Sequence, residues 1–251
     1  ISSPLKTNFW RALTDNDIPS QLPRQSQVWE DASPTLVELN TRLEGSNRVT
    51  EVVRTYLNGQ VRETITYTHN QINQSVGIQF SLEPLVAGTP PPLRYGYQTE
   101  IAANLDRVSY HGLGPHENYV DRQQSAFIAR HELEVSALTT PYIRPQENGN
   151  RGEVRTLDLY TAGQEAPYLS VHKNGDRPFA FSLWSYTQEE LSTLLHDYEL
   201  PYRSDRFTLN IDYGQNGVGG DDSWTTNAAP YPEHRLPWEV GQALEFGIVL
   251  R

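Results

Sequence analysis

The chain contains no cysteine and no methionine among its 251 residues. Without cysteine, disulfides, thiolate metal sites and cysteine nucleophiles are excluded, although the compartment is not fixed. A natural reading frame starts with methionine, so we expect a piece of a longer protein or a processed product. No apolar run reaches the length of a membrane span or of a signal-peptide core, and we expect a cytoplasmic protein.

Basic residues are also few relative to acidic ones. The 31 acidic and 20 basic residues give a formal net charge of −11. This charge argues against nucleic acid and anionic membranes as partners. Because the sequence shows no repeat and no low-complexity linker, we expect a single domain over residues 1–251, a size that all-β folds reach as one unit.

Alternating apolar and polar side chains predict an all-β fold. In residues 76–82 (VGIQFSL), every second side chain is apolar, as in a strand with one buried face. Further strands are predicted at 51–56, 61–68, 94–102, 154–160, 168–171, 179–186, 206–212 and 244–250. Such strands form antiparallel sheets stacked as a sandwich. Since strands do not alternate with helices, a (β/α)8 barrel and a dinucleotide-binding fold are excluded.

Turn residues predict two hairpins. Asn58-Gly59 would join the strands at 51–56 and 61–68, and Lys173-Asn174-Gly175-Asp176 would form a second hairpin. Long loops are predicted at 15–27, 88–92, 110–121, 141–151 and 214–232, and loops of this length often carry function.

One or two short helices are expected. Thr187 and Glu190 form a capping box. The apolar stripe of Leu191, Leu194 and Leu195 would follow, and Pro201 would end the helix.

Residues 217–224 (GVGGDDSW) place a tryptophan directly after a glycine-rich, acidic turn. The glycines permit positive φ, and Asp221, Asp222 and Ser223 can hydrogen-bond to the local backbone. A stiff turn that presents the ring of Trp224 suits a sugar, whose apolar C–H face rests on indole. The alternative is a tryptophan packed in a β core. Two acids and the lack of a lysine disfavour phosphate binding.

A second motif, residues 110–122 (YHGLGPHENYVDR), combines histidines with an acid. His111, His116 and Glu117 are candidates for acid–base or sugar-binding groups. Zinc is an alternative, but no third ligand follows at a typical spacing. Another alternative is a structural corner in which Asp121 and Arg122 hold the loop backbone.

The remaining two motifs are residues 141–151 (PYIRPQENGNR) and 8–17 (NFWRALTDND). In the first, Asn148 can bind sugar hydroxyls or satisfy buried loop carbonyls. In the second, we expect Trp10 in the core with Arg11 as its polar clamp, and the aspartates as turn caps rather than metal ligands. A glycosidase needs two carboxyl groups roughly 5–10 Å apart, but spacing selects no pair among the 31 acids. The serine hydrolase motif G-x-S-x-G is absent.

Together, these four motifs resemble the C-terminal domain of the large β-galactosidases of glycoside hydrolase family 2, over essentially the whole chain. The resemblance implies a large antiparallel β-supersandwich similar to galactose mutarotase. It also implies a C-terminal domain or small subunit of a retaining, lactose-splitting β-galactosidase. The catalytic glutamates, Mg²⁺ and Na⁺ would lie on another domain, a (β/α)8 barrel. The isolated chain would be inactive and bind no cofactor. Its partners would be a β-galactoside and the remaining domains or large subunit.

The resemblance also assigns site residues. Trp224, in the family's GDDSW motif, is the expected substrate platform, and no catalytic or metal-binding residue is expected in this chain. Further candidates for substrate binding are Asp222, Ser223, His111, Glu117 and Asn148. Residues 18–27 resemble the family's mobile active-site loop, but the segment is shortened and carries Pro19 and Pro23, which argues against an open–close motion.

Two other functions remain as alternatives. A stand-alone mutarotase-like aldose epimerase needs two histidines and a glutamate on separate strands, and neither the histidines at 111 and 116 nor His172 and His196 supply them by motif. A carbohydrate-binding or purely structural β-sandwich is the other alternative.

Overall fold

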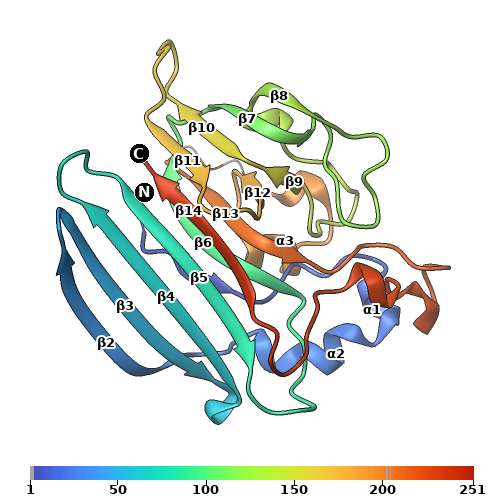
Figure 1. Cartoon of the computed structure of the whole chain (residues 1–251). Helices are drawn as coiled ribbons and strands as arrows, with labels where there is room; N and C mark the ends of the chain where they lie inside the picture. Colours follow the sequence, from blue (N-terminus) through green and yellow to red (C-terminus); the bar gives the residue numbers. More distant parts are fainter. Residues whose placement is uncertain (1–2, 202, 204) are drawn as a thin grey trace.

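The computed structural model describes residues 3–201, 203 and 205–251, which form two stacked antiparallel sheets (Figure 1). The smaller sheet has the order β1 (Lys6–Asn8), β6 (Arg94–Ala102), β13 (Arg206–Gln215), β12 (Phe179–Trp184) and β9 (Arg151–Val154). The larger sheet has the order β2 (Thr35–Glu44), β3 (Asn47–Tyr56), β4 (Val61–Asn70), β5 (Val76–Pro84), β14 (Leu244–Leu250), β11 (Leu169–Lys173), β10 (Thr156–Tyr160), β7 (Arg107–Gly114) and β8 (Phe127–Glu134). This arrangement confirms the predicted all-β supersandwich.

The core lies between the sheets and is rich in aromatic rings. On β5, Ile78, Phe80 and Leu82 are buried while the residues between them face away from the core, as the alternation predicts. The ring of Phe80 stacks on Tyr97 of β6 with centroids 4.0 Å apart, which joins one sheet to the other. Apolar burial of this kind is the main stabilising term of the sandwich.

The turn at Asn58-Gly59 joins β3 to β4 and confirms the first predicted hairpin. Asn58 has φ 56° and Gly59 has φ 84°, the left-handed conformation that these two residue types tolerate. The second predicted hairpin is wrong. The turn after Lys173 connects β11 to β12, and these strands belong to opposite sheets.

Other strand predictions need correction. Of the strand expected at 154–160, Val154 ends β9 and the residues from Thr156 form β10 in the other sheet, so the chain changes sheets at Arg155, shortly after Glu153, whose φ is 56°. The predicted loop at 110–121 starts too early, because β7 continues to Gly114. The sequence analysis predicts no strand at the short β1 or at β2, β7 and β8.

The capping box at Thr187 is confirmed, and it starts α3 (Gln188–Thr193). The predicted apolar stripe and end of this helix are wrong: the helix ends at Thr193, and Leu195 is 67% exposed. Only Leu191 of the three leucines is buried, because the backbone is already extended at Leu194.

The predicted loop at 15–27 contains two short helices, α1 (Asp17–Ser20) and α2 (Leu22–Ser26). Gln21, with φ 67°, separates them, and Pro23 lies in the first turn of α2, where its missing N–H costs no helical hydrogen bond. The described residues thus hold three α-helices rather than one or two. That this segment does not open and close stays a prediction.

Candidate functional site

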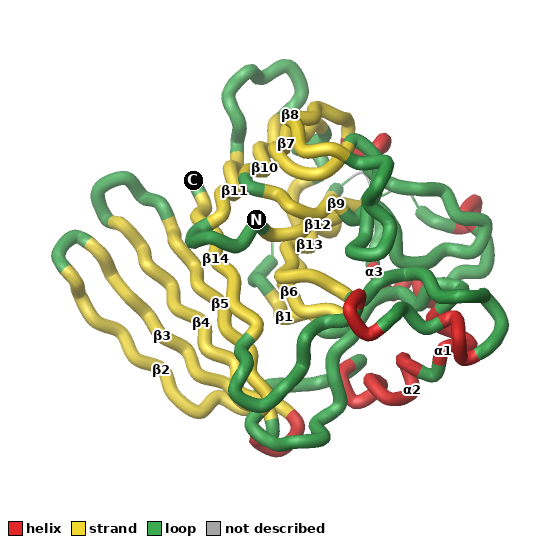
Figure 2. Tube along the Cα trace, turned by 45° about the vertical axis from the view of Figure 1, so that its right-hand side comes forward, coloured by secondary structure: helices red, strands yellow, loops and turns green. Residues whose placement is uncertain are grey.

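The four sequence motifs meet around one pocket. In Figure 2, α1 and α2 lie on the loop-rich side of the sandwich, where these segments gather. A cavity of about 360 Å³ is lined there by residues from all four motifs: Thr14, Asp15, Asn16, Tyr119, Arg122, Tyr142, Gln146, Glu147, Val218 and Ser223. The next residue along the chain is Trp224, whose side chain is 78% exposed. The alternative of a tryptophan packed in the β core is therefore excluded.

The turn that carries Trp224 is anchored from two sides. The guanidinium of Arg11 is fully buried and donates hydrogen bonds to the carbonyls of Asn216 (2.6 Å) and Gly217 (2.9 Å). Asp17 balances this cation at 2.8 Å. The backbone N–H of Gly219 donates to Asp121 at 2.8 Å. Two motifs distant in sequence thus fix the turn.

The expected role of Arg11 as a clamp of Trp10 is wrong, because its guanidinium bonds to the carbonyls of the Trp224 turn instead. Asp17 accepts from the N–H of Thr14 at 3.0 Å, as expected of a turn cap, whereas Asp15 pairs with the side chains of Arg144 and Gln146.

Asp222 orients the backbone at the tryptophan. Its carboxylate accepts hydrogen bonds from the N–H groups of Trp224 (3.0 Å) and Thr225 (2.9 Å) and from the Thr225 hydroxyl (2.6 Å). The Thr225 side-chain and backbone hydrogen bonds, followed by that of Trp224, lower the pKa of Asp222 because they favour the ionised form. Asp222 therefore fixes the backbone that carries the indole, and Ser223, between Asp222 and Trp224, lines the pocket.

A buried ionic cluster lies behind the pocket. Arg94 pairs with Asp212 at 2.9 Å and with Glu147 at 3.2 Å, and all three side chains are fully buried. Burial raises the pKa of Asp212 to about 6, and the neighbouring Arg94 opposes that rise. One carboxylate oxygen of Asp212 has no hydrogen-bond partner among the described residues. The pairing with Arg94 therefore offsets only part of the free-energy cost of burying this carboxylate.

Tyr119 lines the pocket, while its hydroxyl is buried from solvent. Its side chain is buried, and the hydroxyl has no hydrogen-bond partner within the described part of the chain. Burial, followed by the nearby Glu147, raises the pKa of this phenol well above its usual value.

Glu117 and Asn148 connect loops beside the pocket instead of lining it. The Glu117 carboxylate accepts from the N–H of Gly149 at 2.7 Å and from the side chains of Tyr142 and Arg122. Burial acts to raise the pKa of Glu117, but these hydrogen bonds outweigh it and lower the pKa. Asn148 is buried and bonds to the carbonyl of Gln146 at 2.9 Å.

His111 lies on β7 and is exposed on the larger sheet, away from the lining of the Trp224 pocket. The structure therefore brings Trp224, Asp222 and Ser223 together and leaves His111, Glu117 and Asn148 outside the pocket. A substrate-binding role for each of the six stays a prediction. Among the residues placed by the structure, no group of three or more His, Asp or Glu side chains is arranged to hold a metal ion.

The sequence analysis does not predict the Arg94–Asp212 pair or the burial of Tyr119 beside the pocket. Arg94 and Asp212 are 118 positions apart, so no local pattern connects them. Tyr119 lies inside the motif at residues 110–122, and a prediction that its side chain is buried was the signal that could have found it.

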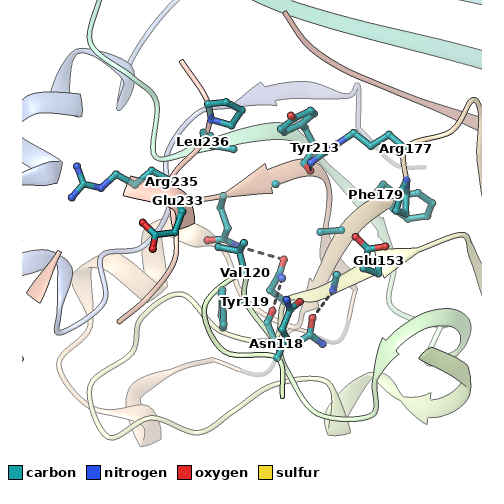
Figure 3. Close-up of a pocket in the computed structure, with 18 residues that line it drawn as sticks. Asn118, Tyr119, Val120, Glu153, Arg177, Phe179, Tyr213, Glu233, Arg235 and Leu236 are labelled. Atoms are coloured by element: carbon teal, nitrogen blue, oxygen red, sulfur yellow. Dashed lines mark hydrogen bonds between the residues drawn. The ribbon is translucent and has the colours of Figure 1, made fainter. Parts of the chain in front are cut away.

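A second pocket, of about 380 Å³, is also lined by Tyr119 (Figure 3). Its buried amides are used internally: Asn118 donates to two loop carbonyls, and Asn150 donates to the carbonyl of Asn118 at 2.7 Å. At its edge, the guanidinium of Arg177 covers the ring of Tyr213 at 3.6 Å. This ring is therefore less available to a sugar than the exposed indole of Trp224.

Comparison with known proteins identifies the family. The family described as "Beta galactosidase small chain" matches residues 1–250. The chain belongs to the β-galactosidase small-chain family. It is 34% identical over 233 residues to a β-galactosidase of Priestia megaterium and 34% identical over 242 residues to one of Vibrio cholerae. In both cases the match covers 92% of this chain and 22% of the relative, so the chain spans about a fifth of their length.

Solved structures with a similar fold are distant in sequence. The galactosidase domain of an α-galactosidase-sucrose kinase matches 90% of this small-chain domain and 28% of its own chain, with 10% identity and a TM-score of 0.47. A galactose mutarotase related enzyme from Lactobacillus acidophilus matches 85% of this domain and 70% of its own chain, with 8% identity and a TM-score of 0.38. The small-chain family match does not favour the alternative of a stand-alone epimerase.

No helix in the described residues is long and apolar enough to cross a membrane.

Proposed function

We propose that this chain is the C-terminal domain or small subunit of a retaining β-galactosidase of glycoside hydrolase family 2, and that Trp224 forms one wall of its substrate site. The supporting observation is an indole that is 78% exposed on a turn anchored by Arg11 and Asp121. A large exposed ring on a rigid backbone is suited to stacking, because little conformational entropy is lost when the ligand binds.

The ligand in this proposal is a neutral β-galactoside. The pocket beside Trp224 is lined by the neutral polar side chains of Asn16 and Ser223. Such neutral groups can pair with sugar hydroxyls, while the indole covers the apolar face of the ring. Covering half of an indole removes on the order of 100 Å² of apolar surface from water, or about 2.5 kcal/mol.

The bond-breaking carboxyl groups belong, in this proposal, to the remainder of the enzyme. Asp15 and Glu147 line the pocket, but Asp15 pairs with Arg144 at 2.6 Å and Glu147 pairs with Arg94 at 3.2 Å. A retaining glycosidase needs one carboxylate free to attack and one carboxylic acid able to protonate the leaving group. We further propose that the Mg²⁺ and Na⁺ sites lie on the remainder of the enzyme, as the family resemblance implies.

The test is Trp224→Ala in the complete β-galactosidase. We expect KM to rise roughly tenfold to a hundredfold, because about 2.5 kcal/mol of stacking is lost. Trp224→Phe should recover part of the affinity. Tyr198→Ala is the matched control, since Tyr198 is a similarly exposed aromatic residue on another segment. An unchanged KM in Trp224→Ala would contradict the proposed role.

An assay of the isolated chain tests whether the catalytic carboxyl groups lie outside it. Purified on its own, it should release no nitrophenol from a nitrophenyl β-galactoside. Turnover by the pure chain would show that it contains its own catalytic pair.

A further inference from the structure

The two sheets differ in width, and the smaller one ends before it covers the larger one. Its edge strand β1 is three residues long. On it, the hydroxyl of Thr7 donates to Glu63 of β4 at 3.0 Å and accepts from Arg54 of β3 at 3.0 Å. The smaller sheet therefore ends opposite β3 and β4. Figure 2 shows β2 on the far side of β3, further from β1.

One row of paired residues shows which face of the larger sheet is uncovered. Phe246, Phe80, Ile65, Val52 and Leu39 are direct partners in turn across β14, β5, β4, β3 and β2. Directly paired residues share one face of a sheet. The first three are buried in the core, Val52 is partly buried, and Leu39 is 60% exposed. The core face of the larger sheet thus continues into solvent at β2.

On β2, three large apolar side chains lie on the face that continues the core face of the larger sheet. Leu36 and Leu43 share that face with Leu39 and are 59% and 69% exposed. We call these three residues the leucine face of β2. The opposite face carries the polar side chains of Glu38, Asn40 and Arg42. Three large apolar side chains on one face, bordered by polar residues, mark an interaction surface.

Two polar features lie near the leucine face of β2, at the edge of the smaller sheet. The Nε of Arg54 is buried and has no hydrogen-bond partner among the described residues. In addition, β1 has one neighbouring strand, β6, in the described sheet, so its other edge is open. An open edge offers backbone N–H and C=O groups to a further strand.

We propose that strands from the remainder of the β-galactosidase pair with the open edge of β1 and cover the leucine face of β2. Strand addition satisfies the edge of β1 through main-chain hydrogen bonds, and side chains on the inner face of the added strands pack against the leucines. The smaller sheet has five strands and the larger has nine, and β1 ends the smaller sheet opposite β3 and β4, so the added strands would lie opposite β2. This inference rests on the proposed function.

The occupant is the remainder of the enzyme rather than a second copy of this chain. The relatives from Priestia megaterium and Vibrio cholerae carry most of their length outside the matched region. A second copy would bring another net charge of −11 to the contact, and like charge opposes self-association.

Single cysteines test the proposal, because this chain contains no other thiol. Leu39→Cys places a thiol on the leucine face, and Asn40→Cys is the matched control one residue away on the opposite face. Each variant is treated with a maleimide, both as the isolated chain and within the complete β-galactosidase. Labelling is measured by mass spectrometry of the peptide that carries the thiol.

In the isolated chain, both thiols should react at similar rates. In the complete enzyme, Leu39→Cys should react at least about tenfold more slowly, because a covered thiol reacts only when the contact opens, while Asn40→Cys should be unaffected. Equal labelling of both thiols in an active enzyme would overturn this inference and leave the proposed function standing. Protection of Leu39→Cys in the isolated chain that increases with concentration would also overturn it, since a second copy would then be the occupant. A complete protein that shows the labelling contrast but cleaves no β-galactoside would instead contradict the proposed function.

Discussion

Asp121 and Gly219, 98 positions apart, are joined by a hydrogen bond of 2.8 Å from the glycine N–H to the aspartate carboxylate. The same carboxylate lies so close to Gly217 that a Cβ there would be 2.3 Å from it. Asp121 therefore holds the turn that presents Trp224, although it is not itself among the residues that line the pocket.

We predict that Asp121→Ala in the complete enzyme raises KM several-fold with little change in kcat. A hydrogen bond to a charged group contributes about 1.5–3 kcal/mol, and its loss loosens the turn without touching the bond-breaking groups. Asp121→Asn, which keeps an acceptor oxygen, should have a smaller effect. The measurements are KM, kcat and the thermal midpoint of each variant. If Asp121→Ala keeps the wild-type KM while Trp224→Ala does not, the turn is held by other contacts.

The sequence predicts the sandwich well where alternation is regular. On β5, the apolar side chains all lie on one face. Between β3 and β4, the Asn58-Gly59 turn also predicts the hairpin connection. The prediction from the sequence fails where the chain passes from one sheet to the other. No residue type marks the boundary between β9 and β10, because the chain enters the larger sheet at Arg155 through backbone hydrogen bonds to His111 and Lys173, which are distant in sequence. The leucines of β2 also escape the pattern, since a bulge between Leu36 and Glu38 interrupts the alternation.

For the site, the motifs predict which segments matter but not which side chains face the ligand. Trp224 and Glu117 both follow glycine-containing turns, yet one is exposed and the other bonds to neighbouring loops. The direction of a loop side chain depends on tertiary contacts such as the bond between Glu117 and Gly149. The Arg94–Asp212 pair is similarly invisible in sequence, because its members meet only when β6 pairs with β13.

The glycines of the Trp224 turn provide a matched pair of substitutions. A Cβ at Gly220 would lie 2.3 Å from the backbone oxygen of Asn227, whereas a Cβ at Gly219 would meet nothing closer than 3.5 Å. We predict that Gly220→Ala displaces the turn, lowers the free energy of unfolding by about 1–3 kcal/mol and raises KM, as overpacking does elsewhere. Gly219→Ala should stay near wild type in both measurements. Equal effects of the two substitutions would show that the turn tolerates the added methyl group.

The buried carboxyl of Asp212 predicts a specific pH dependence of stability. Burial raises its pKa from 3.8 to about 6 against the opposing effect of Arg94, while in the unfolded chain it titrates near its ordinary value. Between about pH 4 and pH 6 the folded protein therefore binds the proton more tightly than the unfolded chain. The free energy of unfolding must then fall as pH rises through this window. Relative to Asp212→Asn, the wild-type protein should lose about 2–3 kcal/mol between pH 4 and pH 6.5.

Urea unfolding of both proteins at several pH values measures this difference, because groups unaffected by the substitution cancel. Asp222→Asn is the control with the opposite sign. Hydrogen bonds lower the pKa of Asp222, so its contribution is present above the ordinary aspartate pKa and is lost as pH falls through the lowered value. A difference between wild type and Asp212→Asn that stays flat or grows with pH would mean that Arg94 outweighs burial, and that Asp212 titrates at or below its ordinary pKa.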